Sequence, residues 1–263
     1  MDFDYGALYS NILENILSNN SFELLNEFIN RNGINFKNYE KKSLLHVACE
    51  SFNDTEKIKY LLERKANLNE KDEKQENTPL FYLLKNKQND LKTTKYLVDL
   101  KADLNLVNKN KDTALHMHLM NTHVSLEITK YLIERKGDPN KLNLNGHNLL
   151  HLSVLHESNL VDHVKYFVDK KVDLDASSFT SLSLAVQRRN VSLPILKLVC
   201  NPGNVNFSTN YSTPLGFVYQ NSYSNKNYYK IFSDIISFLV YNKANPFLVP
   251  KVKKKKLRII FIF

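Results

Sequence analysis

The feature that most constrains this chain is a short segment that recurs six times at nearly constant spacing. Each copy opens with Ser, Thr or Asn and carries a leucine two residues later. Successive openings lie 35, 35, 35, 32 and 33 residues apart. Such a period predicts an array in which each repeat packs against its neighbours, so that the chain is not divided into independent globular domains. The six openings are Ser43, Thr78, Thr113, Asn148, Thr180 and Thr213.

The second half of each repeat recurs as well, as KYLLERKANLN, KYLVDLKADLN, KYLIERKGDPN and KYFVDKKVDLD. The apolar residues follow helical spacing, so each repeat is predicted to hold two helices. The opening hydroxyl can cap the first helix, and Pro79 and Pro214 fall where a helix tolerates proline. We expect the leucines after each opening, and second-helix residues such as Tyr96 and Tyr131, to lie in the core.

A period near 33 residues with a Thr-Pro-Leu-His opening and a Gly-Ala-Asp-x-Asn close resembles the ankyrin-repeat family, over nearly all of the chain. The resemblance implies an all-α ankyrin-repeat solenoid of helix-turn-helix units with short β-hairpin fingers. We also expect a degenerate N-terminal capping repeat at 1–37, in which Ser21 is a candidate cap for the second helix. An array of about six repeats then follows at 38–248, and a basic and hydrophobic C-terminal tail at 249–263.

One departure from the family pattern concerns the glycine after the second helix, which normally adopts a left-handed conformation. A lysine replaces it in five repeats, and each such residue costs roughly 1 kcal/mol there. We therefore expect a solenoid less stable than an idealised one. These lysines are Lys65, Lys101, Lys136, Lys171 and Lys243.

The formal charge of +9 describes the tail more than the repeats. Residues 251–258 hold six Lys or Arg and no acid, which leaves 30 basic against 27 acidic residues elsewhere. Cys49 and Cys200 lie in different repeats and form no disulfide framework, which favours a reducing compartment. No signal peptide is recognisable, and the longest apolar run is only 259–263. We predict an intracellular, cytoplasmic protein, with nuclear import through the tail as an alternative.

The histidines raise the question of a metal site. In the resemblance, His46, His116 and His151 take the Thr-Pro-Leu-His position, where the imidazole bonds between adjacent segments. Sets such as His116, His118 and His123 are poor ligand sets, because residues two apart lie on different faces of a helix. We predict no metal and no cofactor.

Motifs that would indicate catalysis are missing from the sequence. It has no Gly-x-Ser-x-Gly, no phosphate-binding loop, no Gly-x-Gly-x-x-Gly and no His-Glu-x-x-His. Carboxylates such as Asp72 and Glu73 are expected to be solvated at finger tips. The sequence therefore predicts a protein that is not an enzyme.

The resemblance implies a protein partner bound on the concave face, by the finger tips and the exposed positions of the first helices. Met120, Leu144 and Leu155 are the large apolar members of this set and suggest a binding patch. The full set is Tyr39, Lys42, Lys74, Gln75, Asn77, Lys85, Lys109, Asn110, Asp112, Met120, Leu144, His147, Leu155, His156, Gln187 and Arg188.

Two further groups are candidates for function. The family resemblance implies that a hydroxylase can modify Asn69, Asn105 and Asn140. A tyrosine cluster near the C-terminus is a second interface candidate, with packing of a cap as its alternative. This cluster is Tyr211, Tyr219, Tyr223, Tyr228 and Tyr229.

We therefore predict a non-enzymatic adaptor or inhibitor that binds another protein and uses no small-molecule substrate. The Asn-, Lys- and Ile-rich repeats are similar to those of poxviruses, AT-rich protists and intracellular bacteria, which suggests a host-directed modulator. One alternative is a regulatory fragment of a larger enzyme or channel. Another is a nucleic-acid or membrane-surface binder that acts through the tail at 251–258.

Overall fold

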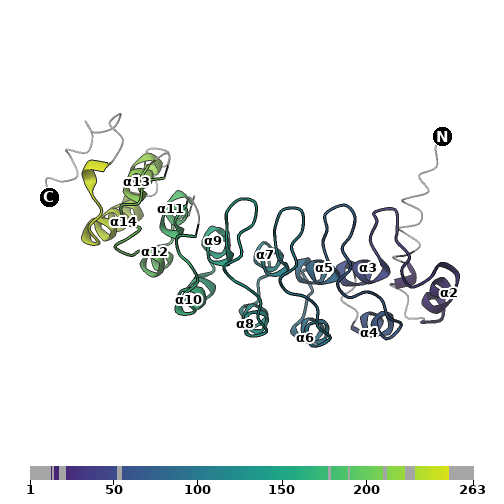
Figure 1. Cartoon of the computed structure of the whole chain (residues 1–263). Coiled ribbons are helices and arrows are strands. Elements are labelled where there is room, and N and C mark those ends of the chain that lie inside the picture. The colour runs from purple at the N-terminus through teal and green to yellow at the C-terminus, as the bar shows by residue number, and fades with distance from the viewer. Residues whose placement is uncertain are drawn as a thin grey trace, which may run out of the picture. The chain divides into compact units, whose positions relative to one another are not determined.

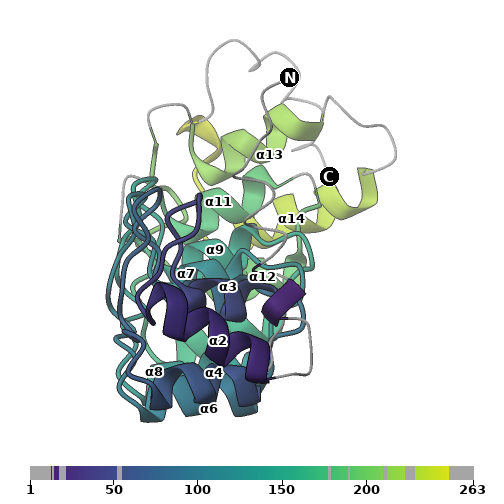
Figure 2. The ribbon, with the colours of Figure 1, turned by 90° about the vertical axis from the view of Figure 1, so that its right-hand side faces the viewer.

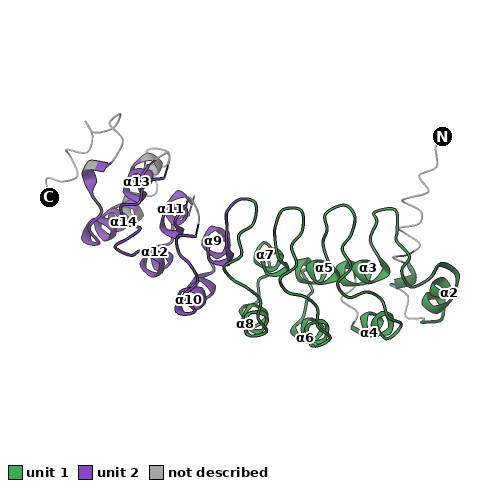
Figure 3. Ribbon diagram, viewed as in Figure 1, with its two compact units in different colours: residues 1–144 green, residues 145–263 purple. Residues whose placement is uncertain are grey.

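The fold is built from short helices joined by loops (Figure 1). The computed structural model describes residues 13, 15–17, 22–51, 55–176, 179–188, 190–209, 212–222 and 229–248. The predicted cap at Ser21 and the tail at 249–263 lie outside these residues. The chain forms two compact units, 1–144 and 145–263 (Figure 3).

The described part of unit 1 includes helix α2, which is preceded by helical residues at 15–17, and three helix pairs. In Figure 1 the first helices of the pairs form one row and the second helices form another. Each first helix packs on the first helix of the next pair, as the repeat period predicts. The helices are α2 (Phe22–Asn32), α3 (Leu44–Ser51), α4 (Thr55–Glu63), α5 (Pro79–Lys85), α6 (Leu91–Asp99), α7 (Ala114–Leu119) and α8 (Leu126–Glu134).

Unit 2 holds three further pairs and a short closing turn. Its last long helix, α14, begins at Tyr229. The helices are α9 (Leu149–Leu155), α10 (Val161–Asp169), α11 (Ser181–Gln187), α12 (Leu193–Val199), α13 (Pro214–Ser222), α14 (Tyr229–Tyr241) and the 3₁₀ helix η2 (Pro246–Leu248). No helix among the described residues is long and apolar enough to cross a bilayer.

The core contains the residues that the period predicted. The leucine of each opening is buried, and so is an apolar residue from each second helix, such as Leu97 in α6. The prediction was wrong for Tyr96 and Tyr131, which are half-buried. In both helices the residue that follows the tyrosine is buried instead, so each ring lies at the edge of the core. The Lys59 ammonium lies 5.7 Å from the ring centre of Tyr96, and the Lys95 ammonium lies 5.5 Å from that of Tyr131.

The predicted side-chain caps form at several first helices but not at Thr78, whose hydroxyl makes no cap bond to α5. Thr113 Oγ1 accepts from the backbone N–H of His116, and Asn148 Oδ1 accepts from that of His151. Pro79 and Pro214 are the first residues of α5 and α13, as predicted. These caps satisfy helix N–H groups that would otherwise have no partner.

The second helices end in the same way in five repeats. The five lysines that replace the family glycine have positive φ angles of 65, 72, 72, 58 and 70°, so they adopt the left-handed conformation of that glycine. In each case the lysine N–H and the next N–H bond back to carbonyls of the helix, for example from Lys101 to Val98 and from Ala102 to Leu97. This pairing is the Schellman arrangement, which satisfies the last helix carbonyls.

The described fingers are closed by turns and not by paired strands. A tight turn closes each of the first three, as in the 3.0 Å bond from Asn108 N–H to the Asp112 carbonyl. Among the described residues no strand is formed, and the pairing of Lys37 with Ser43 is an isolated bridge. The predicted β-hairpins are therefore turns, because each arm is too short to add further ladder bonds.

Candidate functional site

The fingers of unit 1 are joined to one another by their backbones. Lys109 N–H donates to the Gln75 carbonyl at 2.9 Å, and Leu144 N–H donates to the Asn110 carbonyl at 2.8 Å. The Lys109 ammonium also donates to the carbonyls of Glu73 and Lys74. Figure 2 shows the finger loops of this unit along one edge. The tips thus form a stacked surface that is held in place.

Side chains also join the bases of these fingers. Asn108 Nδ2 donates to Asn77 Oδ1 at 3.0 Å, and Asn143 Nδ2 donates to Asp112 Oδ1 at 2.9 Å. Asp112 is only 4% exposed, so its prediction as a surface contact was wrong. Its carboxylate lies in the joint between two fingers, a position that depends on the neighbouring repeat.

The C-terminal ends of the first helices are joined in a similar way. Asn86 Nδ2 donates to the Glu50 carbonyl at 2.9 Å, and Asn121 Nδ2 donates to the Lys85 carbonyl at 3.0 Å. Glu50, Lys85 and Met120 each stand seven residues after their repeat opening. These three residues form a line across α3, α5 and the end of α7, which we call the inner row.

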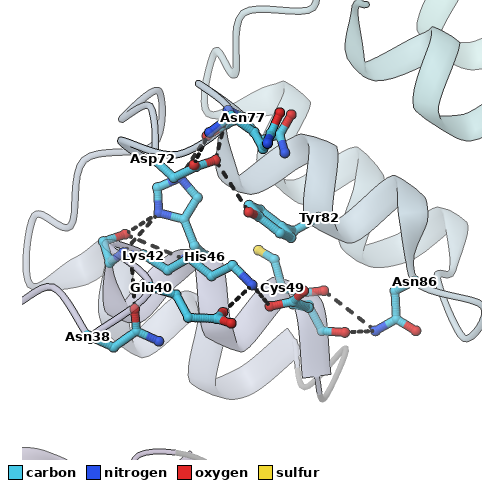
Figure 4. Close-up of polar contacts among 12 residues, drawn as sticks. Asn38, Glu40, Lys42, His46, Cys49, Asp72, Asn77, Tyr82 and Asn86 are labelled. Atoms are coloured by element: carbon cyan, nitrogen blue, oxygen red, sulfur yellow. Dashed lines mark hydrogen bonds and ion pairs between the residues drawn. The ribbon is translucent and has the colours of Figure 1, made fainter. Parts of the chain in front are cut away.

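At the start of the inner row, Lys42 lies between two carboxylates (Figure 4). Its Nζ is 2.6 Å from Glu50 Oε2, 2.8 Å from Glu40 Oε2 and 4.7 Å from the ring centre of Tyr82. Burial lowers the pKa of Lys42, but the hydrogen bonds to Glu40 and Glu50 outweigh burial and raise it above its ordinary value. The side chain is only 13% exposed. Lys42 therefore organises the carboxylates and is not the free contact that the sequence predicted.

Asp72 lies behind this cluster and corrects a second expectation. It is 2% exposed and accepts bonds from the backbone N–H groups of Gln75 and Asn77. The Tyr82 hydroxyl also donates to Asp72 Oδ2 at 3.3 Å, and burial raises the pKa of Tyr82 to about 12. Asp72 is thus a buried organiser of the finger and not a solvated charge, because its turn directs backbone donors at it.

The repeat histidines have the predicted structural role. His46 Nδ1 is 2.7 Å from Ser43 Oγ, and its Nε2 is 3.0 Å from the Asn77 carbonyl in the next finger. In unit 2, His151 Nε2 is 3.3 Å from the Leu174 carbonyl. Burial lowers the pKa of both imidazoles, so both are neutral at pH 7.

Unit 2 continues the pattern with a different residue. The Arg188 guanidinium donates to the His156 carbonyl at 2.7 Å, as the asparagines of unit 1 do. Burial lowers the pKa of Arg188. Leu155 and His156 are half-buried, and so is His147, whereas Gln187 is exposed. Arg188 thus connects two first helices within the unit.

The remaining predicted contacts of unit 1 are accessible. Tyr39 is 71% exposed, Leu144 60% and Met120 46%. Lys74, Gln75, Lys85, Lys109 and Asn110 are exposed too. Together with Glu50, these eight residues form a surface that we call the inner face.

Sequence reasoning missed three residues of this site. Asn86 and Asn121 set the spacing of the inner row, and Leu142 is exposed two residues from Leu144. The signal for the asparagines was their common phase, since each follows its repeat opening by eight residues. Spacing alone does not tell an exposed asparagine from one that joins two repeats.

Two of the asparagines predicted as hydroxylation sites have a structural role. Asn105 Nδ2 donates to the Lys136 carbonyl at 2.9 Å, and its Oδ1 accepts from Asp138 N–H at 2.9 Å. Asn69 makes the same pair of bonds to Lys101 and Asp103. Asn140 is exposed. Hydroxylation of these three residues stays a prediction.

The tyrosine cluster is described only in part. Tyr219 is buried, at 4% exposure, which fits the packing alternative for this residue. Tyr211, Tyr223 and Tyr228 lie outside the described residues, and so does the side chain of Tyr229.

Comparison with known protein families identifies ankyrin repeats in this chain. The family model for ankyrin repeats, which holds three copies, matches residues 13–108, 84–178 and 125–210. Together these matches cover well over half of the chain, including every helix from α2 to α12. A search of the curated proteins found no match.

Proposed function

Because this chain belongs to the ankyrin-repeat family, whose members generally serve as protein–protein interaction modules, we propose that it is a non-enzymatic adaptor or inhibitor that binds a partner protein through the inner face. The observation that carries this proposal is the exposure of Met120 and Leu144. Large apolar side chains surrounded by polar ones are typical of the centre of an interface.

The joints between repeats support the proposal. The inner face stands on helix ends and finger turns that neighbouring repeats hold in place, through Asn86, Asn121 and the backbone bonds of Lys109 and Leu144. Association costs less conformational entropy when the binding groups are already ordered. A rigid surface of this kind suits recognition of a folded partner or of a short segment.

The test is partner capture from a cell lysate with three forms of the full chain. One form is wild type, and the second carries Met120→Glu and Leu144→Arg. The matched control carries Leu24→Glu and Leu100→Arg, since these leucines are 44 and 45% exposed but lie off the inner face. Circular dichroism establishes that all three are folded.

We expect a stoichiometric partner that wild type and the control retain and that the inner-face variant loses. Retention by the inner-face variant together with loss by the control would contradict the proposal. A truncation to 1–250 tests the tail as an alternative, because loss of the partner in that form alone would transfer binding to residues 251–263.

The setting of this function is part of the same proposal. Cys49 and Cys200 are free thiols, which supports a reducing, cytoplasmic location. A host-directed role rests on the style of the repeats, and the test is whether the captured partner comes from a host lysate.

A further inference from the structure

The inner row changes its chemistry from one repeat to the next. At α3 the carboxylates of Glu40 and Glu50 outnumber the single ammonium of Lys42, and they are 47 and 39% exposed. At α5, Lys85 is exposed and makes no ion pair with any described residue. At the end of α7, Met120 is exposed and apolar. From α3 to the end of α7, the inner row therefore presents an acidic, then a cationic, then an apolar position.

The spacing of these three positions is regular. Asn86 joins the first step and Asn121 joins the second by equivalent bonds to helix-end carbonyls. Axes of packed helices lie about 8–10 Å apart, so each step of the row is about that long. The acidic cluster and Met120 are then about 16–20 Å apart.

One backbone conformation matches this step well. A polyproline II segment rises about 3.1 Å per residue with three residues per turn, so every third side chain points the same way at intervals of about 9.3 Å. In a β-strand, residues three apart point to opposite faces. In an α-helix the matching same-face spacing is seven residues, at about 10.5 Å.

We infer that the inner row binds an extended, polyproline II-like segment of the partner that carries a cationic, an acidic and an apolar side chain at every third position. This inference rests on the proposed function and specifies the chemistry of the partner. The cationic side chain lies against Glu40 and Glu50, the acidic one against Lys85, and the apolar one against Met120. Attraction between unlike charges selects the register of the segment. A segment in which the cationic and acidic side chains are exchanged would place like charges together.

Lys42 contributes to this selectivity. It holds the Glu50 and Glu40 carboxylates at 2.6 and 2.8 Å, so a cationic side chain meets acceptors that are already placed. Asp72 and Lys74 also act on Glu40, and with them the cluster has three carboxylates and two ammonium groups, which is a net charge of −1. A cationic partner therefore neutralises it, whereas an acidic partner is repelled.

The test is selection of random 12-residue peptides displayed on phage, against four folded forms of the full chain. These forms are wild type, Glu50→Lys with Lys85→Glu, Lys85→Glu alone, and a control that carries Lys92→Glu with Glu127→Lys. The control reverses the same two charges at exposed positions of α6 and α8. Selected peptides are then titrated by fluorescence polarisation against each form.

We expect wild type and the control to enrich one order, cationic-x-x-acidic-x-x-apolar, in either chain direction. The double reversal is expected to exchange the two charged positions and to bind wild-type peptides at least tenfold more weakly. Lys85→Glu alone, which leaves Lys42 and its carboxylates intact, is expected to lose only the acidic position.

Three outcomes would overturn this inference without deciding the proposed function. Enriched peptides that show no charge order, or an order that the reversal leaves unchanged, would overturn the inference and leave the proposed function standing. A seven-residue spacing would overturn the extended conformation. Failure to enrich any peptide that needs the inner face would overturn the inference, while partner capture would still decide the proposed function.

Discussion

The side-chain amide of Asn121 donates a 3.0 Å hydrogen bond to the backbone carbonyl of Lys85, which ends the first helix of the preceding pair. Asn86 makes the equivalent bond to Glu50. Each bond joins residues 36 positions apart and spans one repeat. The residues beside these asparagines belong to the inner row, so the same bonds that stabilise the array also space that row.

Replacement of Asn121 by Ala is expected to destabilise unit 1 by about 1–3 kcal/mol, because it leaves carbonyls near a buried amide without their donor. The amide also lies 3.3 Å from the carbonyls of Leu84 and Asn86. Urea unfolding followed by circular dichroism measures the effect. Asn110→Ala is the control, since Asn110 is exposed and is expected to change stability by less than about 0.5 kcal/mol. Equal effects of the two substitutions would contradict this role of Asn121.

Replacement of Lys171 by Gly is expected to stabilise the chain by up to about 1 kcal/mol. Its φ of 58° is unfavourable for any residue with a Cβ, while the greater freedom of glycine in the unfolded chain offsets part of the gain. The control is Lys165→Gly, an exposed position inside α10, where glycine costs about 1 kcal/mol. Opposite shifts of the urea midpoint are expected, and loss of stability in both would refute the argument.

Acid is expected to destabilise unit 2 through His151. Burial lowers the pKa of this imidazole to about 4, while the unfolded value is about 6.5. Between these values the unfolded chain binds the proton and the folded chain does not, so stability is complete above about pH 6.5 and falls as the pH drops towards 4. The loss is on the order of 3 kcal/mol.

Urea midpoints at pH 7.5 and 5.0 measure this dependence. His151→Asn is expected to be less stable at pH 7.5 but to lose less of its stability on acidification than wild type. His123→Asn is the control because His123 is exposed, and it is expected to keep the wild-type dependence. An unchanged pH dependence in His151→Asn would assign the effect to other groups.

The two thiols are expected to react at different rates with a disulfide reagent at pH 8. Burial raises the pKa of both thiols, but Cys49 is fully buried whereas Cys200 is only half-buried and therefore more accessible to the reagent. Since the thiolate is the reactive form, Cys49 should react only when the first repeats open. Cys200→Ser leaves Cys49 alone to be followed. Labelling of Cys49 at the rate of a free thiol in native buffer would contradict its burial.

Much of the fold could be predicted because its determinants are local and periodic. The burial of Leu45 and Leu97 follows from spacing, and the positive φ of Lys101 follows from its place after a helix. The errors in predicting burial arose where two neighbouring residues both fit the apolar stripe of a helix and only one of them is buried. Tyr96 and Leu97 both fit a helical stripe, and only the packing of the next helix decides that the leucine is buried.

The sequence by itself determined the repeat, its pairs of helices, their caps and the phase of the inner face, since these depend on residues within one repeat. The tertiary structure decided which polar residues of that face are free. Asp112 and Asn143 meet across 31 positions, and Lys42 is enclosed between Glu40 and Glu50 above the ring of Tyr82. Whether a polar side chain stays accessible to a partner depends on its contacts with the neighbouring repeat. Only the stacked repeats show which donors have an acceptor in the next repeat.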